Sequence, residues 1–571
     1  MKLQDKIKRN RFAFEQLENR QLLTGNVNVD TSTGPAVITG DNSANVISIT
    51  QTAPDTFKIT GFGTTITGPK TFTTTEGIFI DMRGGNDSLT LKNMTINGDT
   101  GEIGLGIILG PGTDALVMSG VNVTYQTAIS GGDKNAMVID KCNFNCDLGI
   151  EGGEGVDAVT ITRTNIDGAL SIDLLDGTNA LTMVTVNVSA LDDGGGSYPY
   201  ETLPPGFENL PDILPAEGTD CGAEIDGGSG VDAIAMVSVQ IDCETDINTY
   251  GGVDSVAITN SRFGDALLPT AEVVTQVTPV STDMEFSGLC IETGTGNDAV
   301  AINGTTVYGF LQIDTTGGYD CPTDEICDIA SGAQPQGTEQ TGKDGNDAVV
   351  LNNVKVLQSE EGLCLEQWCE CCETTNPNII ANGIDNAPCW FQCCCDMSVL
   401  ESGMLLIYTG NQVDSVALNK VTTDAEANIY TTDESSLDGA DAVAITNSNF
   451  NQNNEVMECS VLPLVETGDG LYVETGNGND AVTIAKVNVV GEAEIQTGAG
   501  TDAVAINALV ADDIFVDLGS GKYDVLTIAK SVANTETFDG AGTTSGDTLV
   551  YKHLGNNFAN PPDISGFQYV V

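Results

Sequence analysis

The sequence predicts an all-β protein, a parallel β-helix (β-solenoid) with about 22 residues per coil, irregular caps and loop insertions. A phrase of the form G-x-G-x-D-A-V-x-I recurs, and its Asp residues, which we call anchors, include Asp157, Asp232 and Asp502. Adjacent anchors such as Asp480 and Asp502 are 22 residues apart. Because one short unit cannot bury its apolar face alone, such units must stack into a solenoid. A β-propeller or a string of β-sandwiches is the alternative, but a propeller blade needs about 40 residues, which a 22-residue spacing does not supply.

The elements follow one another along the chain. Residues 1–24 are a basic N-terminal segment, 25–77 an N-terminal β cap, 78–547 the solenoid and 548–571 a C-terminal cap. Apolar residues lie two and four places after an anchor, as in Val159 and Ile161, and again about nine and fifteen places after it, as in Ile166 and Ile172. This period-2 pattern predicts at least two short strands per coil. Coils about 4.8 Å apart would make a rod roughly 70 Å long.

Insertions interrupt the repeat where the anchor spacing exceeds one coil. They lie near 192–222, 264–287, 318–344, 366–400 and 451–467, and the first is proline-rich, which predicts an irregular loop. Counted from the preceding anchor, 318–344 and 366–400 are expected to leave neighbouring coils at the corner that carries the anchors, and to touch. Loops on a solenoid often carry its binding function.

The charge balance excludes several classes of protein. The 571 residues contain 81 Asp plus Glu, 21 Lys plus Arg and one His, a formal net charge of -60. Such a chain is repelled by nucleic acid and by anionic lipid, so its expected partners are cations. No apolar run reaches the roughly 18 residues that span a bilayer, so no transmembrane segment is expected. A few cations recur six places after an anchor, as expected of solvated edge charges: Lys141, Arg163, Lys420, Lys486 and Lys530.

Two columns of acids are expected along the rod. Stacked anchors about 4.8 Å apart would repel by roughly 0.9 kcal/mol per pair in water, and a second acid lies six places before several anchors. Carboxylates that flank a glycine turn are the oxygen ligands that calcium prefers, so calcium is the expected cofactor. The alternative is that each anchor only caps its own turn through an Asx hydrogen bond. The candidate metal ligands are Asp81, Asp87, Glu151, Asp157, Asp226, Asp232, Glu292, Asp298, Glu474, Asp480 and Asp502.

The glycine corner resembles the calcium-binding hemolysin-type repeat G-G-x-G-x-D-x-U-x. Gly152, Gly153, Gly155, Asp157 and Val159 match it in full. The resemblance implies calcium held between turns by Asp carboxylates and glycine-loop carbonyls. Repeats of that family recur every nine residues, whereas these recur every 22, so the family's spacing of ligands between turns is missing.

Sixteen cysteines and one histidine indicate disulfides or all-thiolate metal sites, and the even count favours disulfides in an oxidising compartment. Cys221 and Cys243 are one coil apart and are expected to face each other. The aromatic residues Trp368, Trp390 and Phe391 lie in the Cys-rich insertion, where they form either a small core or a platform for a sugar or protein partner. The disulfide candidates are Cys142, Cys146, Cys221, Cys243, Cys321, Cys327, Cys364, Cys369, Cys371, Cys372, Cys389, Cys393, Cys394 and Cys395.

The stretch F-E-Q-L-E-N-R-Q-L-L near the N-terminus resembles the L-E-P-R-x-L-L segment of exported planctomycete proteins. Leu17, Glu18, Arg20, Leu22 and Leu23 match, and Asn19 replaces the usual proline. The resemblance implies export, and hence an extracellular, cell-surface or cell-wall location.

Together these features predict a non-catalytic, exported structural or adhesive surface solenoid, stabilised by calcium and disulfides. Its expected partners are divalent cations and a cell-surface protein or polysaccharide. One alternative is a β-helix polysaccharide lyase or hydrolase, although the body offers only Arg83, Arg163, Arg262 and His553 for such chemistry. The other is a receptor that binds a partner through its Cys-rich insertion.

Overall fold

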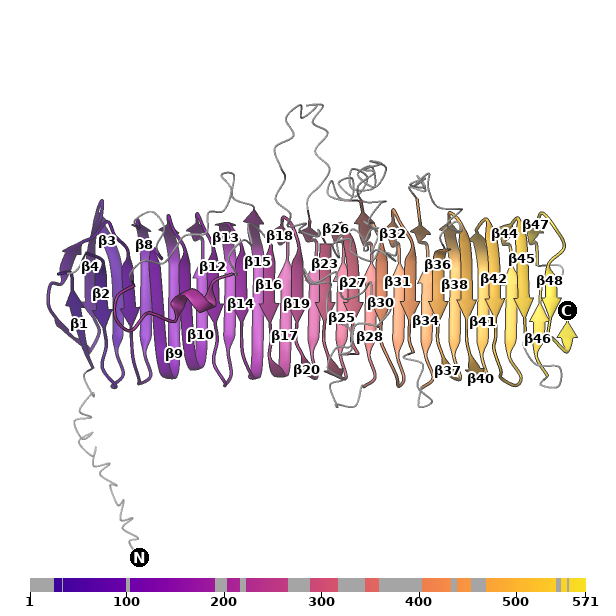
Figure 1. The fold of residues 1–571 in the computed structure, drawn as a ribbon, viewed down its shortest axis with the longest axis horizontal. Coiled ribbons are helices and arrows are strands. Elements are labelled where there is room, and N and C mark those ends of the chain that lie inside the picture. The colour runs from indigo at the N-terminus through magenta and orange to yellow at the C-terminus, as the bar shows by residue number, and fades with distance from the viewer. Residues whose placement is uncertain are drawn as a thin grey trace, which may run out of the picture.

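The computed structural model is a long rod built from stacked β coils (Figure 1). Almost all of its strands belong to one 47-stranded sheet that winds around the rod, and pairing between coils is parallel. The fold class predicted from the repeat is therefore confirmed. The structure describes residues 25–571 except 33, 99–102, 190–202, 216–221, 265–287, 317–344, 359–402, 433–438, 453–468, 541–545 and 552–553.

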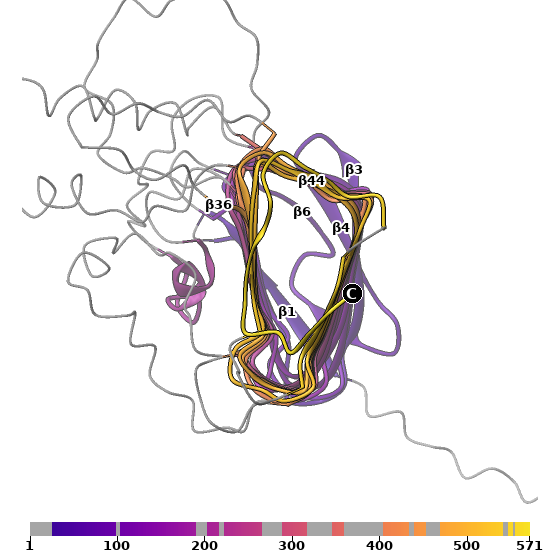
Figure 2. The same ribbon diagram turned by 90° about the vertical axis from the view of Figure 1, so that its right-hand side faces the viewer.

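Each coil has three strand segments, which stack into three faces of a flattened tube (Figure 2). Face A precedes the anchor, face B follows it directly, and face C is short and comes next. Face A contains β2 (Ala36–Thr39), β7 (Ile78–Asp81), the first parts of β9 (Leu105–Val123) and β10 (Thr127–Asp140), β12 (Leu148–Glu151), β14 (Leu170–Asp173), β16 (Ala223–Asp226), β19 (Thr245–Asn248), β23 (Gly288–Glu292), β27 (Phe310–Asp314), β30 (Leu405–Tyr408), β33 (Ala427–Tyr430), β36 (Asp469–Glu474), β39 (Glu492–Gln496), β42 (Asp513–Asp517), β45 (Thr535–Asp539) and β48 (Asp563–Ser565).

Face B is built in the same register from the strand segments that follow the anchors, including the second parts of β9 and β10. Several of them run on into face C. Face B contains β3 (Val46–Ala53), β8 (Ser88–Ile96), β13 (Ala158–Asp167), β15 (Gly177–Ser189), β17 (Ser229–Val237), β21 (Ser255–Thr259), β25 (Ala299–Asn303), β28 (Ala348–Asn352), β31 (Ser415–Asn419), β34 (Ala442–Thr446), β38 (Ala481–Val489), β41 (Ala503–Val510), β43 (Val525–Ala529), β46 (Thr548–Val550) and β49 (Tyr569–Val570).

Face C closes each coil, and two-residue strands mark the corner between faces A and B. Face C contains β11 (Asn143–Phe144), β18 (Gln240–Ile241), β22 (Arg262–Phe263), β26 (Thr306–Tyr308), β29 (Lys355–Leu357), β32 (Thr422–Thr423), β35 (Asn449–Phe450), β44 (Val532–Ala533) and β47 (Asn557–Phe558). The corner strands are β20 (Gly251–Gly252), β24 (Thr295–Gly296), β37 (Asn477–Gly478) and β40 (Ala499–Gly500).

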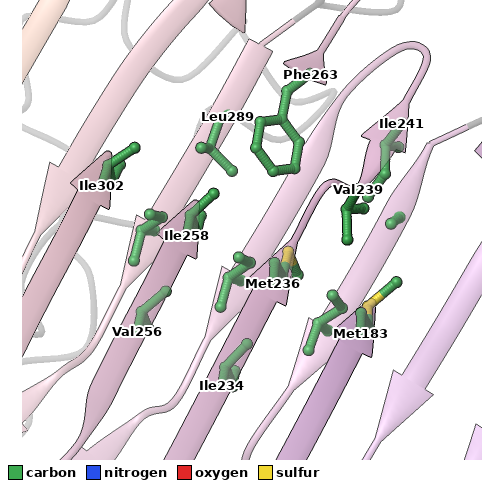
Figure 3. Packing of buried hydrophobic residues seen from close by; sticks show 14 of the residues in the cluster. Met183, Ile234, Met236, Val239, Ile241, Val256, Ile258, Phe263, Leu289 and Ile302 are labelled. Atoms are coloured by element: carbon green, nitrogen blue, oxygen red, sulfur yellow. The ribbon is translucent and has the colours of Figure 1, made fainter. Parts of the chain in front are cut away.

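The core consists of columns of like residues, one from each coil. Met183, Met236, Ile258 and Ile302 stack in register on face B, as Figure 3 shows, and all four are buried. Ile302 pairs next with Leu351, although the insertion 318–344 separates their anchors. The register is therefore kept across insertions, because a slip of one residue would turn the whole apolar set outward.

A second column of special geometry lies at the bend between faces B and C, six places after the anchors. Lys141, Arg163 and Lys530 have φ of 55°, 52° and 56°, in the left-handed region, and Lys, Asn, Ser, Thr, Ala or Gly occupy the same position in other coils. The bend therefore places these cations along the edge of face B. Arg163 does not remain a free edge charge, because its Nε donates to Asp140 Oδ1 at 2.9 Å.

The N-terminal cap combines two kinds of strand pairing. β1 (Asn26–Asp30) pairs antiparallel with β2, and β4 (Thr56–Gly61) pairs antiparallel with both β3 and β6 (Thr71–Thr73), while β5 (Thr65–Thr67) pairs parallel with β1. β2 and β3 in turn pair parallel with the first regular coil. At the other end β46 to β49 continue the parallel pairing. The basic segment 1–24 lies outside the described residues.

Most of each predicted insertion also lies outside the described residues, but part of the first is described. Residues 203–215 contain a short 3-10 helix, η1 (Leu210–Ile213), which lies on the outside of face A (Figure 2). Leu210 packs with Phe79 and Ala128. Gly106 leaves the room for this contact, since a Cβ there would lie 2.6 Å from a Leu210 methyl carbon. The proline-rich stretch therefore forms a strap with its own apolar contacts.

One prediction about the insertions is wrong. The segment 318–344 does leave the rod between β27 and β28, at the anchor corner between faces A and B. The segment 366–400, however, lies between β29, which ends at Leu357, and β30, which begins at Leu405, so it leaves between faces C and A. Counting from the anchor placed the segment after the face A strand of its coil, whereas it comes before that strand.

Candidate functional site: the buried aspartate corner

The corner between faces A and B is built on a column of glycines two places before the anchors. A Cβ on Gly252 would lie 1.5 Å from the Gly230 carbonyl oxygen, and one on Gly500 would lie 1.4 Å from that of Gly478. Only glycine fits here because the backbones of successive coils approach this closely. The close approach brings each anchor against the coil before it.

The anchors point inward and form hydrogen bonds with the neighbouring coil. The backbone N–H of Asp232 donates to Asp254 Oδ1 at 2.8 Å, and the N–H of Asp254 donates to Asp298 Oδ1, also at 2.8 Å. The same bond links successive anchors from Asn45 to Asp547, except for the step from Asp114 to Asn135, for which the described contacts show none. Each anchor thus satisfies an amide that would otherwise be buried without a partner.

The second carboxylate oxygen of the anchors has no uniform partner. In Asp347 and Asp480 the Oδ2 atom accepts from the hydroxyls of Thr315 and Thr475, at 2.8 and 3.1 Å. In Asp157 it accepts from the backbone N–H of Gly153 at 2.9 Å. Other anchors have a buried Oδ2 without a hydrogen-bond partner, which is costly for a charged group. Asp87, Asp114, Asp232 and Asp524 are examples.

Burial raises the pKa of the anchor carboxyls, because it disfavours their charged form. The pKa of Asp232 rises to about 7, with burial as the largest cause and the negative charge of Asp254 as a further one. Asp298 and Asp480 also reach about 7, and Asp347 about 6, again mainly through burial. These four anchors therefore titrate near neutral pH and not near pH 4.

The acids six places before the anchors lie on the outer side of face A and have partners of their own there. Glu151 Oε1 accepts from the Ser130 hydroxyl at 2.9 Å, and Glu474 Oε2 accepts from the Tyr472 hydroxyl at 3.0 Å. Asp81 Oδ1 accepts from the backbone N–H of Arg83 at 2.9 Å. Each of these acids comes one place after an inward apolar residue, as Glu151 follows the buried Ile150, so it points outward, whereas the anchors are buried.

A surface pocket of about 370 Å³ lies beside this outer column. Its acidic lining residues are Glu154, Asp173, Asp176 and Asp226, and Tyr250 also lines it. The pKa of Asp226 rises to about 7, first through burial and then through repulsion by neighbouring carboxylates. Of the residues that line the pocket, only Asp226 was singled out from the sequence.

The structure does not bring the two predicted acids of a coil together as a ligand pair. Among the described residues, no three His, Cys, Asp or Glu side chains are grouped closely enough to hold a metal ion. The anchors Asp87, Asp157, Asp232, Asp298, Asp480 and Asp502 are engaged with backbone amides, and their earlier partners face outward. The sequence analysis did not identify the buried threonines that bind anchor carboxylates, such as Thr475. Their recurrence five places before the later anchors was the signal that could have found them.

Only part of the predicted cysteine and aromatic set is described. Cys142 and Cys146 are not in disulfides, so the prediction for these two is wrong, and burial of Cys142 in the core raises the pKa of its thiol to about 11. Cys243 and Cys290 are disulfide-bonded. The other candidates lie outside the described residues: Cys221, Cys321, Cys327, Cys364, Cys369, Cys371, Cys372, Cys389, Cys393, Cys394, Cys395, Trp368, Trp390 and Phe391.

The three arginines of the body are each beside an aspartate. Arg83 lies 3.7 Å from Asp81, and Arg262 pairs with Asp242 while its guanidinium lies over the Tyr308 ring. Arg163 pairs with Asp140, as described above. His553 lies outside the described residues.

Comparisons with protein-family models, with curated proteins and with solved structures each find no match. Within the described part of the chain, no helix has the length and apolar character needed to cross a membrane.

Proposed function

We propose that this chain is a non-catalytic, exported structural rod of a cell surface or cell wall, with an adhesive or load-bearing role. The observation that carries the proposal is the inter-coil aspartate column. It links one coil to the next along nearly the whole rod and uses the repeated acids for structure. A rigid scaffold needs such coupling between coils, because in a solenoid each coil contacts only its neighbours.

Calcium and disulfides belong to the proposal as stabilisers. The outward carboxylates of face A, such as Asp173 and Asp226, which pair in register on adjacent coils, would attract divalent cations as oxygen ligands, with water completing the coordination. The inward anchors would not need a metal, since backbone amides already bind them. The disulfide-bonded Cys243 and Cys290 support an oxidising compartment.

The arrangement of the arginines supports a structural role over a polysaccharide lyase. Such an enzyme needs cations to neutralise an acidic sugar and a base to take its proton. Here each body arginine is beside an aspartate of the same surface.

Fractionation of native cells tests the proposal. The protein is expected in the medium or the envelope fraction, and recovery from the cytosol alone would contradict it. Incubation of the purified chain with polyuronates is expected to give no ultraviolet-absorbing unsaturated product. A steady rise in absorbance would instead establish the lyase.

A further inference from the structure

The outer side of face B is uncharged over most of the rod. Outward positions of its strands lie one, three and five places after each anchor, as Ala299, Ala301 and Asn303 do in β25. From β13 to β43, the described strands carry only Ala, Ser, Thr, Val and Asn at these positions. Charged residues make up 18% of the chain, so the absence of any charge from these outward positions distinguishes face B from the rest of the sequence.

This face is open to solvent. The outward valines Val237, Val350 and Val525 expose 37%, 45% and 39% of their surface. The strap with η1 lies on face A, the opposite side of the tube, and no described segment covers face B between β13 and β43 (Figure 2). An extended, partly apolar and unpartnered sheet face marks an interaction surface.

We propose that face B binds a second copy of this chain, with the two rods packed face to face. The size of the face fits a stable dimer. Strands from β13 to β43 span about 50 Å at a spacing of about 4.8 Å, and five residues of strand span about 16 Å. Each copy would then bury about 800 Å², or about 1,600 Å² in total, which is the size of a standard specific interface.

Charge selects this face for self-association. Two chains with a net charge of -60 repel each other, so they can approach closely only through a surface that carries no carboxylates. Face A presents acids such as Asp173, Asp226 and Glu474 along its outer side, and face B presents none between β13 and β43. The cations at the B to C bend, such as Lys420 and Lys486, further lower the negative charge at the edge of face B.

The geometry of the face also matches a second copy. Two sheets pack about 10 Å apart when their side chains interdigitate. Both copies have the same strand spacing and the same two-residue side-chain period, so small residues of one can fit between those of the other along the whole face. A partner without this repeat would meet the face at only a few points. The inference does not depend on the proposed function.

Sedimentation velocity of the full chain at physiological ionic strength tests this dimer. The expected result is a species of twice the chain mass at micromolar concentration. The double variant Ala301→Glu, Ala505→Glu places two carboxylates on exposed positions of face B and is expected to weaken self-association at least tenfold. Matched controls are Ala301→Ser with Ala505→Ser, which keep the face neutral, and Thr537→Glu, which adds a charge to face A; both should remain dimeric.

Thermal melts followed by circular dichroism show that the variants stay folded. A wild-type chain that is monomeric at every concentration would overturn the proposal, and so would a dimer that the double glutamate variant leaves unchanged. A monomer that sediments with an insoluble polysaccharide, and loses this with the glutamates, would also overturn it and assign the face to a glycan.

Discussion

Faces A and B have the same architecture inside and opposite surfaces outside. Both present buried aliphatic columns to the core, such as Ile225 and Ile247 on face A and Ile258 and Ile302 on face B. Outward, face A carries Glu151, Asp173 and Asp226, whereas face B from β13 to β43 carries no charged residue. The stacking of coils therefore constrains only the side chains that point inward, and the side chains that point outward can differ from face to face.

The anchors lie at the corner that joins these two faces, so a change of pH should alter the stability of both. This is the largest effect that we expect. The pKa of anchors such as Asp114 and Asp502 is raised to about 6, and that of Asp87 and Asp298 to about 7, above an unfolded value near 3.9. A raised pKa means that the folded state binds protons more tightly, so the contribution is fully present below about pH 4 and is lost as pH rises through 6 to 7.

The melting temperature should therefore be higher at pH 5 than at pH 8, by on the order of 10 °C. Calorimetry at fixed ionic strength measures it. A melting temperature that falls between pH 8 and pH 5 would show that the anchors are stabilised in their charged form, for example by a bound cation.

The next largest effect is the difference in stability between substitutions on the inner and on the outer side of face B. Ile302 is buried, and Ile302→Ala should lower the free energy of unfolding by about 2–5 kcal/mol. Its neighbour Ala301 is exposed, and Ala301→Ser should change it by less than about 0.5 kcal/mol. Denaturant melts compare the two, and equal losses would mean that face B is not a one-sided sheet.

A smaller effect is expected at the corner itself. Asp232→Ala removes the acceptor of the Asn179 backbone N–H, which lies 3.1 Å away, and should cost about 1–3 kcal/mol. Asp232→Asn keeps an acceptor oxygen and removes the charge, as Asn179 already does in its coil, where its Oδ1 accepts from the backbone N–H of Asp157. This control should be at least as stable as the wild type at pH 8. If the Asn variant instead loses as much as the Ala variant, the charge of Asp232 is needed.

Calcium should shift the melting temperature less than the other changes do, and it should bind only to face A. Saturating calcium is expected to raise the melting temperature by a few degrees, and a chelator to reverse it. The double variant Asp173→Asn, Asp226→Asn should reduce the shift, whereas the face B variant Ala301→Ser should not. Scanning calorimetry with and without the ion decides, and an unchanged melting temperature in the wild type would remove calcium from the proposed function.

The repeat could be predicted from the sequence because its signal is the period itself. Residues such as Val159, Ile161, Ile166 and Ile172 are all buried, at the offsets that the alternation indicated. The anchors were also expected to stack. The partner of each anchor could not be predicted, because it is a backbone amide of the adjacent coil, and no residue type identifies it.

The orientation of the outer acids was open to prediction and was missed. Glu151 is one place further along the strand than the buried Ile150, so the alternation that identified the core also directs Glu151 outward. The neutral outer side of face B, with residues such as Ala299 and Ala301, was equally readable from the repeat. The corner of the insertion 366–400 was misplaced because residues 362–366, G-L-C-L-E, have nearly the sequence of the face A strand β23, G-L-C-I-E.

The anchor column has a direction, and this bears on how such a rod can change its length. Apart from the step between Asp114 and Asn135, each inner coil offers one amide donor to the coil that follows it and one carboxylate or amide oxygen to the coil that precedes it. A whole coil copied in tandem would therefore bring its own matching donor and acceptor, and no buried group would lose its partner. Duplication or deletion of complete 22-residue units is thus the route by which relatives of this chain would become longer or shorter, and changes of any other size are expected only in the loops.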